Sequence, residues 1–370
     1  MESASNEDYF RSYEDIAVHE LMIKDAPRTE AYRKAIEEDP TLLQGKVVMD
    51  IGAGTGILSL FAARAGARKV YAIEASSMAK VARQIVQDNS LGSVIEVIES
   101  RVEDLQLPEG EKVDVIISEW MGFYLLHESM LNSVVHARDR FLKPEGRMFP
   151  SSAQIYAAIV SMDAFYEEKV HFWQSVYGFN LSSVVPLAQR GALATNVVVD
   201  ISSSQVLSTP FLLADLDLQT VRMEDLEHLH EEAFFSTTHA GTFHAFCLWF
   251  DVGFPSVEGR PPVVLSTAPD SPSTHWKQFI ISMPEPMSLE SGTCVEATFN
   301  LTQDTENPRF YNVSAQLTNV EAPTDESMSD TTSAYVLPGH EPQCECAKCQ
   351  VARAFLLQAE LDEEVDLDIS

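Results

Sequence analysis

Residues 46 to 142 alternate between short apolar runs and amphipathic stretches, and this alternation limits the fold more than any other feature of the chain. Apolar runs at 46–50, 70–73, 93–98 and 113–117 predict buried strands, and the stretches at 57–65, 78–87 and from 130 onward predict helices. Strands and helices in alternation form a mostly parallel sheet that the helices cover. The sequence therefore predicts an α/β, Rossmann-like domain over residues 46–150.

A glycine-rich turn, Gly52-Ala53-Gly54-Thr55-Gly56, follows the first predicted strand. Glycines at alternate positions let the backbone approach a ligand closely. The dinucleotide fingerprint G-x-G-x-x-G has its third glycine where this chain has Ile57, and this difference disfavours NAD. The turn by itself is compatible with several other nucleotide cofactors.

Acidic residues flank this turn and follow the later strands. Glu74 ends the second predicted strand, where its carboxylate can accept both hydroxyls of a ribose. Glu103 follows the third strand, where it can accept a hydrogen bond from an adenine amino group. With Asp50 before the glycines, these acids predict an adenosine ligand, and the whole pattern is that of S-adenosylmethionine.

The stretch from Ser118 to Met130 carries two acids on a strand-to-helix loop. Glu119 and Glu128 stand on either side of a glycine and several bulky residues. Ligands of open α/β sheets bind beyond the carboxyl ends of the strands, which is where this loop emerges. Two carboxylates there would suit a clamp on one planar cation. The alternative is that Glu128 only complements the dipole at the start of the next helix, and the loop alone leaves both readings open.

The formal net charge of −31 restricts the partners of the chain. A phosphate-backbone binder needs the opposite sign, so direct nucleic-acid binding is not expected, whereas a negative field favours cationic protein partners. The alternative is that the charge only keeps the protein soluble. No apolar run approaches the roughly 20 residues of a membrane span. We expect a soluble protein in a reducing compartment, with Cys247 and Cys294 as small core residues.

After Leu142 the alternation stops, and residues 146–150 are predicted to lead into a second domain over 151–320. Short β-rich runs at 154–160, 195–201, 243–252, 262–266, 276–283 and 293–301 predict an antiparallel, β-barrel-like domain. Inside it, residues 165–185 are aromatic and helix-like. This segment either packs on its own barrel or forms a self-association arm, and both readings stay open.

The two ends of the chain differ from these domains. Residues 9–36 predict two short helices interrupted by Pro27, so residues 1–45 are interpreted as a helical cap that lies against the next unit. Residues 321–370 form an acidic, Ser/Thr-rich tail, predicted to be flexible. The tail cysteines Cys344, Cys346 and Cys349 have metal-like spacing, but nothing nearby completes a tetrahedral zinc site, so no metal is predicted.

Motifs spread over residues 9–320 match one known family. They are Tyr9-Phe10-x-Ser12-Tyr13, the turn Asp50 to Gly56, Glu74, Val102-Glu103, the loop Ser118 to Met130, and Thr274-His275-Trp276. On these residues the chain resembles the type I protein arginine methyltransferases. Within that family, the stretches Ile51 to Ser59, Leu125 to Ser129 and Val264 to Thr267 resemble the nuclear, histone-modifying member conventionally numbered six. Leu21 stands where the family has a second glutamate after His19. The resemblance favours the nucleus, but the family's basic import signal is not visible, so the cytoplasm stays open.

The resemblance implies a role for each matching position. For the cofactor, S-adenosylmethionine, it implies His19, Arg28, Gly52, Gly54, Glu74, Val102 and Glu103. For catalysis on a substrate guanidinium it implies Glu119 and Glu128, supported by an Asp25–His275 pair. For the substrate pocket it implies Tyr9, Tyr13, Met22, Met130 and Trp276. It also implies a homodimer, arginine-rich partners such as histone tails, and monomethyl and asymmetric dimethyl products.

The chemistry of arginine leads to the same acids. Its positive charge is delocalised, so two carboxylates must draw that charge away before one terminal nitrogen can attack a methyl group. Holding the reacting atoms in line can lower the barrier by roughly 7–11 kcal/mol, so neither a metal nor a covalent intermediate is needed. Either Glu128 or the Asp25–His275 pair can take the proton. A small-molecule methyltransferase and a non-catalytic scaffold for basic partners are the alternative functions.

Overall fold

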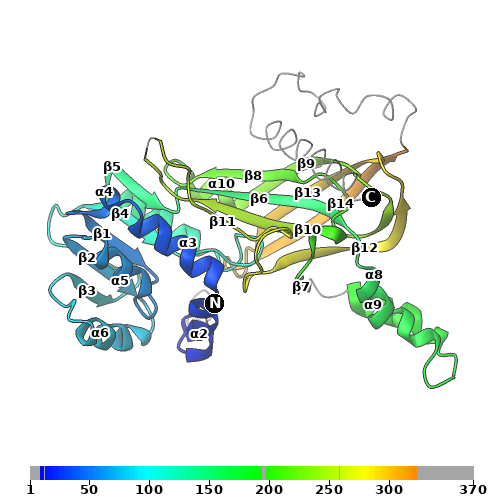
Figure 1. The fold of residues 1–370 in the computed structure, drawn as a ribbon, viewed down its shortest axis with the longest axis horizontal. Helices are drawn as coiled ribbons and strands as arrows, with labels where there is room; N and C mark the ends of the chain where they lie inside the picture. Colours follow the sequence, from blue (N-terminus) through cyan, green and yellow to red (C-terminus); the bar gives the residue numbers. More distant parts are fainter. Residues whose placement is uncertain (1–8, 12, 194–196, 258, 323–370) are drawn as a thin grey trace, which may run out of the picture.

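A five-stranded parallel sheet organises the first half of the chain, and a computed structural model describes it together with the rest of residues 9–11, 13–193, 197–257 and 259–322 (Figure 1). Its strands are β1 (Val47–Ile51), β2 (Lys69–Glu74), β3 (Ile95–Glu99), β4 (Val113–Ser118) and β5 (Leu142–Phe149). They lie in the order β3-β2-β1-β4-β5. The connections change direction between β1 and β4, and the crevice beyond their carboxyl ends is the expected ligand position.

Three helices connect these strands, as the sequence predicts. They are α5 (Ile57–Arg64), α6 (Met78–Asp88) and α7 (Met130–Phe141). Every position of β1 is buried, which explains its unbroken apolar run, because helices cover both faces of a parallel sheet. None of the helices in the described part of the chain is both long and apolar enough to cross a membrane.

The helices before the sheet pack against both halves of the protein. They are α2 (Ile16–Lys24), α3 (Ala26–Glu37) and the short α4 (Pro40–Leu43). Asp25 ends α2 and also caps α3, where its side chain accepts from the Arg28 amide, and Pro27 falls in the first turn, which tolerates proline. The predicted pair of helices is therefore confirmed. Tyr32 of α3 is fully buried between Phe254 and the end of β4.

The second half is built from antiparallel strands, as predicted. The larger sheet contains β6 (Ser152–Val160), β7 (Val197–Val199), β8 (Phe211–Asp217), β10 (Gly241–Gly253), β11 (Val264–Ser266) and β12 (Gln278–Leu289). A three-stranded sheet contains β9 (His228–Ser236), β13 (Cys294–Gln303) and β14 (Tyr311–Glu321). The short α10 (Met223–Glu227) precedes β9. Buried phenylalanines, including Phe235, Phe246 and Phe299, contact one another in the core between the sheets.

Four strands lie where the sequence predicts none, namely β5, β8, β9 and β14. The expectation that the first domain ends its alternation at Leu142 is wrong, because β5 pairs in parallel with β4 and completes the sheet. The expectation of two buried cysteines is half wrong: Cys247 is buried, whereas Cys294 is exposed at the start of β13.

The aromatic segment between β6 and β7 projects from the barrel (Figure 1). It contains α8 (Asp163–Lys169), two short 3-10 turns and α9 (Val185–Leu193). Its base packs on the barrel, because Tyr166 and Val170 are buried there. Its tip does not: Tyr177 is 97% exposed and Phe179 is 73% exposed. The base therefore packs on the barrel as the first reading expects, and the exposed tip leaves the self-association reading a prediction.

Candidate functional site

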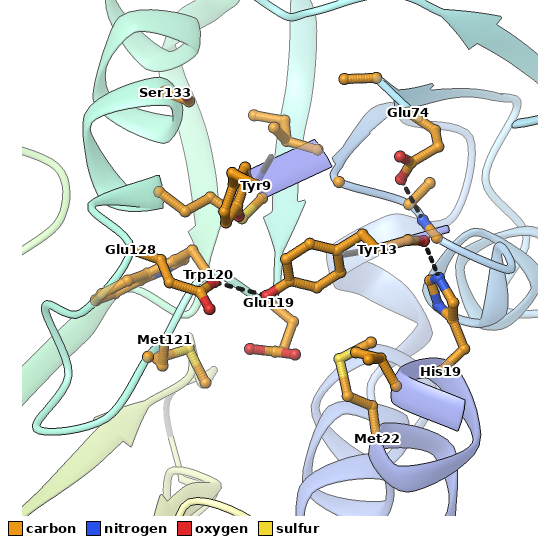
Figure 2. A pocket seen from close by; sticks show the side chains of 18 of the residues that line it. Tyr9, Tyr13, His19, Met22, Glu74, Glu119, Trp120, Met121, Glu128 and Ser133 are labelled. Atoms are coloured by element: carbon orange, nitrogen blue, oxygen red, sulfur yellow. Dashed lines mark hydrogen bonds between the residues drawn. The ribbon is translucent and has the colours of Figure 1, made fainter. Parts of the chain in front are cut away.

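One cavity of about 280 Å³ lies beyond the carboxyl ends of β1, β2 and β4. The N-terminal helices, the loops after these strands and two loops of the barrel all contribute to its wall. Every residue to which the resemblance assigns a role lines it except Asp25, namely Tyr9, Tyr13, His19, Met22, Arg28, Gly52, Gly54, Glu74, Val102, Glu103, Glu119, Glu128, Met130, His275 and Trp276. Asp50 of the predicted adenosine pattern lies before the turn instead, fully buried, where it accepts from the Ser59 hydroxyl at 2.6 Å. Figure 2 shows several of the lining side chains around the cavity. Residues from 9 to 309 are thus brought to one place.

The glycine turn forms one end of the cavity. Gly52 and Gly54 have positive φ angles of 70° and 55°, which only glycine adopts at little cost. A Cβ on Gly54 would lie 3.1 Å from His19 Cε1, so the turn and α2 meet closely. Glu74 holds the turn in place: one of its oxygens accepts from the Gly54 amide at 2.8 Å and the other from the Ser76 amide at 2.8 Å.

Glu103 and Val102 line the same end after β3. The Ser133 hydroxyl on α7 donates to Glu103 Oε1 at 2.6 Å. Burial raises the pKa of Glu103, but the hydrogen bond from Ser133 and the positive charge of Arg101 outweigh burial and lower it overall. Glu103 is therefore an ionised acceptor at neutral pH. The sequence analysis did not predict the contribution of Ser133, although its position one turn after Met130 on a helix facing this loop is a usable signal.

The loop between β4 and α7 has a strained backbone. Gly122 and Leu125 bond each other in both directions at 3.0 Å, and a Cβ on Gly122 would lie 2.2 Å from the His127 carbonyl oxygen. Four residues other than glycine have positive φ angles, namely Tyr124, Leu125, Glu128 and Ser129. Such residues cost on the order of 1–3 kcal/mol each and persist only where their surroundings hold them. The loop is thus held in one conformation by its neighbours.

Glu119, at the start of this loop, forms a buried ion pair with Arg28. Arg28 donates from Nε at 3.0 Å and from Nη2 at 2.7 Å to Glu119 Oε2, and the two side chains are only 7% and 9% exposed. Arg28 Nη1 also donates to the Met22 carbonyl at 3.1 Å. The resemblance implies a cofactor carboxylate as the partner of Arg28. The structure places it against Glu119, and since a guanidinium has five N–H donors, this pairing does not exclude a second carboxylate.

Glu128 turns its carboxylate into the cavity. The Tyr13 hydroxyl donates to Glu128 Oε2 at 2.6 Å, and His19 Nε2 donates to the Tyr13 carbonyl at 2.8 Å, so Tyr13 lies between the two (Figure 2). Burial raises the pKa of Glu128, and the charge of Glu119 raises it further against the lowering effect of the Tyr13 hydrogen bond. This geometry favours a ligand-binding role over a simple charge at the start of α7.

Two residues before β12 connect the barrel to the site. His275 donates to Asp25 Oδ2 from its amide at 2.9 Å and from Nδ1 at 2.6 Å, so the predicted Asp25–His275 pair is present. Burial raises the pKa of Asp25, but the hydrogen bonds from His275 and from the Arg28 amide outweigh it and lower the pKa overall. Trp276 is buried, and its indole Nε1 donates to the Met121 carbonyl at 2.8 Å. Trp276 therefore anchors the β4–α7 loop.

The cavity has two arginines that the sequence analysis did not assign to the site, Arg101 and Arg309. Arg309, between β13 and β14, donates from Nη1 to the Glu128 carbonyl at 3.0 Å and lies over the Tyr9 ring. An arginine in a polar loop is ordinarily a surface residue, and its 181-residue separation from Glu128 left no local signal. Within the described residues, no group of three His, Cys, Asp or Glu side chains is arranged to hold a metal ion. The three tail cysteines lie outside the described residues.

Comparison with known proteins decides the family. Residues 48–146 match the family model described as "Methyltransferase domain", and residues 151–320 match "Arginine methyltransferase oligomerization subdomain". Probable protein arginine N-methyltransferase 6.1 of Oryza sativa subsp. indica is 44% identical over 333 residues, which span 84% of this chain and 87% of the relative. The chain belongs to the type I protein arginine N-methyltransferases. Protein arginine N-methyltransferase 6 of Danio rerio is 45% identical over 82% of this chain and 88% of its own length.

Solved structures agree with this membership of the type I protein arginine N-methyltransferases. The Trypanosoma brucei PRMT1 enzyme-prozyme heterotetrameric complex with AdoHcy matches with a TM-score of 0.73 and 34% identity, over 83% of this chain and 100% of that one. The crystal structure of PRMT6-SAH matches with a TM-score of 0.70 and 33% identity, over 82% and 100%.

S-adenosylmethionine is the methyl donor of this arginine methyltransferase. The described residues fit that cofactor. Gly52 and Gly54 line the cavity with left-handed backbone, Glu74 lies at the end of β2 beside the turn, and Glu103 is ionised after β3. The two alternative functions, a small-molecule methyltransferase and a non-catalytic scaffold, are therefore wrong.

Proposed function

We propose that this enzyme methylates arginine side chains of basic proteins such as histone tails, and that Glu119 and Glu128 bind the guanidinium. One observation carries the proposal: two carboxylates face a single half-buried cavity, and Arg28 neutralises only one of them. The raised pKa of Glu128 indicates that its negative charge is unfavourable until a cation enters. We also propose the nucleus as its place of action, where histones are found, with the cytoplasm as the alternative.

Each residue of the site has a separate role in the proposed methyl transfer. S-adenosylmethionine supplies an electrophilic methyl group on a sulfonium. Arg28 holds Glu119, and Tyr13 holds Glu128, so both carboxylates are already oriented before a substrate arrives. Together they draw the guanidinium charge toward the nitrogens they bind, which leaves one terminal nitrogen with the lone pair that attacks. Glu128 then takes the proton, because its raised pKa makes it a stronger base than an ordinary carboxylate.

The same geometry supports monomethyl and asymmetric dimethyl products. Met22 and Met130 both line the cavity, and Met130 reaches the glycine turn, where its Cε would lie 2.4 Å from a Cβ on Gly52. Thioether side chains are flexible, so they can make room for a nitrogen that already carries one methyl group. A second transfer to that nitrogen gives the asymmetric product.

Mass spectrometry tests the proposed activity. The full chain is incubated with isotopically labelled S-adenosylmethionine and a histone-tail peptide rich in both arginine and lysine. Label is expected on arginine only, first as monomethylarginine and then as dimethylarginine whose fragmentation releases dimethylamine. Label on lysine, or dimethylarginine that releases only monomethylamine, would contradict the proposed substrate or product.

The proposed role of Glu128 predicts a pH dependence. The carboxylate must be ionised to hold the guanidinium, and burial with the Glu119 charge raises its pKa, so activity should be lost as pH falls through that raised value. We expect kcat/KM for an arginine peptide to decline at a pH above the ordinary glutamate range, since kcat/KM reports the free enzyme. A pH series of initial rates with the folded state checked at each pH measures this. A decline only within the ordinary carboxyl range would remove Glu128 as the titrating group.

We also propose a homodimer that forms through the projecting segment 163–193. The matched subdomain is an oligomerization subdomain, and the tip of the segment exposes Tyr177 and Phe179, which the described part of one chain leaves uncovered. Replacing both with serine should give a monomer in sedimentation velocity at micromolar concentration, where the unaltered chain sediments as a dimer. Val264→Ser is the matched control, because Val264 is 52% exposed on the barrel away from this segment. A monomeric unaltered chain, or a dimer that persists in the serine variant, would overturn the assignment.

A further inference from the structure

Arg309 makes two contacts that no other side chain of the barrel combines in the described part of the site. Its guanidinium carbon lies 3.6 Å from the centre of the Tyr9 ring and 5.4 Å from that of Phe10. Its Nη1 donates to the Glu128 carbonyl oxygen at 3.0 Å. A cation is attracted to the face of an aromatic ring, most strongly where water is excluded. One side chain from the barrel therefore reaches both the N-terminal segment and the backbone of a carboxylate in the site.

The loop that carries Arg309 is itself well supported. The Ser129 hydroxyl donates to the Pro308 carbonyl at 2.6 Å, and Gln303 Nε2 donates to the same carbonyl at 2.6 Å. The Asn307 side chain accepts from the Arg309 amide at 3.3 Å. These bonds fix the loop against the residue that follows Glu128, so the arginine approaches Glu128 from a rigid base.

Glu128 needs such support because its backbone is strained. Its φ is 72° and that of Ser129 is 51°, and left-handed conformations are strained for residues other than glycine. The φ and ψ angles of Glu128 decide where its carboxylate points. The hydrogen bond from Arg309 to the Glu128 carbonyl oxygen therefore helps to fix the direction of the Glu128 side chain.

The N-terminal segment, which carries Tyr9 and Tyr13, contacts the Glu128 carboxylate directly. The Tyr9 and Tyr13 rings meet edge to face at 5.1 Å, and the Tyr13 hydroxyl donates to Glu128. The contact of Arg309 with the Tyr9 ring therefore helps to hold Tyr13 over the site. There the Tyr13 carbonyl also accepts a hydrogen bond from His19.

We propose that Arg309 is a positioning residue that clasps the N-terminal segment to the Glu128 backbone, so that the closure of the pocket and the aim of the Glu128 carboxylate depend on one guanidinium. The proposal rests on the proposed role of Glu128 in holding the substrate. It assigns to the barrel a direct part in arranging the acid, beyond its part in covering the cavity.

Arginine variants with a matched control test the clasp. Arg309→Met keeps the length of the side chain but loses the cation and the donors, and Arg309→Lys keeps a cation over the ring. Arg260→Met is the control: Arg260 also joins the barrel to the N-terminal helices, through the Glu38 carbonyl at 2.7 Å, but lies outside the site. With both substrates saturating, Arg309→Met should lower kcat about 10- to 100-fold, the scale of a small misplacement of a reacting group. Arg309→Lys should recover part of this, and Arg260→Met should match the unaltered enzyme.

Two further readouts separate the clasp from general stability and from the proposed function. Cleavage by chymotrypsin after Tyr9 or Phe10 should be faster in Arg309→Met than in Arg260→Met, with equal melting temperatures, and this measurement needs no substrate. Tyr9→Leu should lower kcat as well, and the double variant should lose less than the product of the two single effects, because both remove one contact. Equal kcat and equal cleavage in the two arginine variants, or fully additive effects with Tyr9→Leu, would overturn the proposal. Failure of the unaltered enzyme to methylate arginine would instead overturn the proposed function.

Discussion

Glu128→Gln should lower single-turnover methyl transfer by about 10²-fold or more, the scale on which losing one electrostatic stabiliser in a dry site acts. Glutamine keeps the length of the side chain and an oxygen that can accept from Tyr13, so only the charge is lost. If Glu128 served only the dipole of α7, the same change would cost about 0.3–1 kcal/mol of stability and leave turnover nearly intact. S-adenosylmethionine affinity should hardly change, since Glu74, Glu103 and the glycine turn lie at the other end of the cavity.

The measurement pairs rapid-quench methylation with calorimetric titration of the cofactor. Glu296→Gln is the matched control, because Glu296 lies on β13 outside the cavity. Near-normal methylation by Glu128→Gln would remove Glu128 from the mechanism. Glu119→Gln is a less direct test than its sequence position implies. Its neutralisation also leaves Arg28 buried without its anion, and breaking a buried pair in this way costs about 3–5 kcal/mol of stability.

Gly54→Val should abolish measurable S-adenosylmethionine binding. Gly54 has a φ of 55°, a left-handed angle that costs other residues about 1–2 kcal/mol. The new Cβ would stand 3.1 Å from His19 Cε1, before the two methyl groups of valine are added. His19 is almost fully buried and holds the Tyr13 carbonyl, so it has no room to retreat without moving the N-terminal segment.

Gly110→Val is the control for this effect. Gly110 has a φ of 77°, and no described atom would lie within 4 Å of a Cβ added there, so valine brings the backbone strain without the obstruction. Calorimetry on both folded variants should find the cofactor bound by Gly110→Val only. Equal affinity in the two variants would show that the glycine turn of residues 52–56 is needed only for folding.

The parallel sheet was predictable because its signals are local. The run Val47–Ile51 is apolar at every position but Asp50, and Gly56 marks the start of α5. The strand β5 was not, because Pro144 and Gly146 interrupt it and its pairing with β4 shifts register between Val113 and Val115. Such a strand is stabilised by its neighbour in space more than by its own residues.

The sequence analysis missed some barrel strands for a related reason. In β14 exposed polar residues, such as Asn312, Ser314 and Gln316, alternate with side chains that are only partly buried. This strand lies at the edge of its sheet, where the apolar signal is weak. Arg309 could not be predicted because it is 181 residues away from Glu128 in the sequence. Glu119 and Glu128 could be predicted because both lie on one short loop.

The left-handed loop after β4 has a consequence for how this protein can be divided. Three of its supports come from the barrel half: Trp276 binds the Met121 carbonyl, Arg309 binds the Glu128 carbonyl, and the Pro308 carbonyl accepts from Ser129. The two halves are therefore not interchangeable modules. A nucleotide-binding half transplanted onto another scaffold would keep Glu119 and Glu128 but lose the barrel contacts that hold the loop between them in its conformation. Redesign of substrate preference is safest on barrel surfaces that leave these three anchor points where they are.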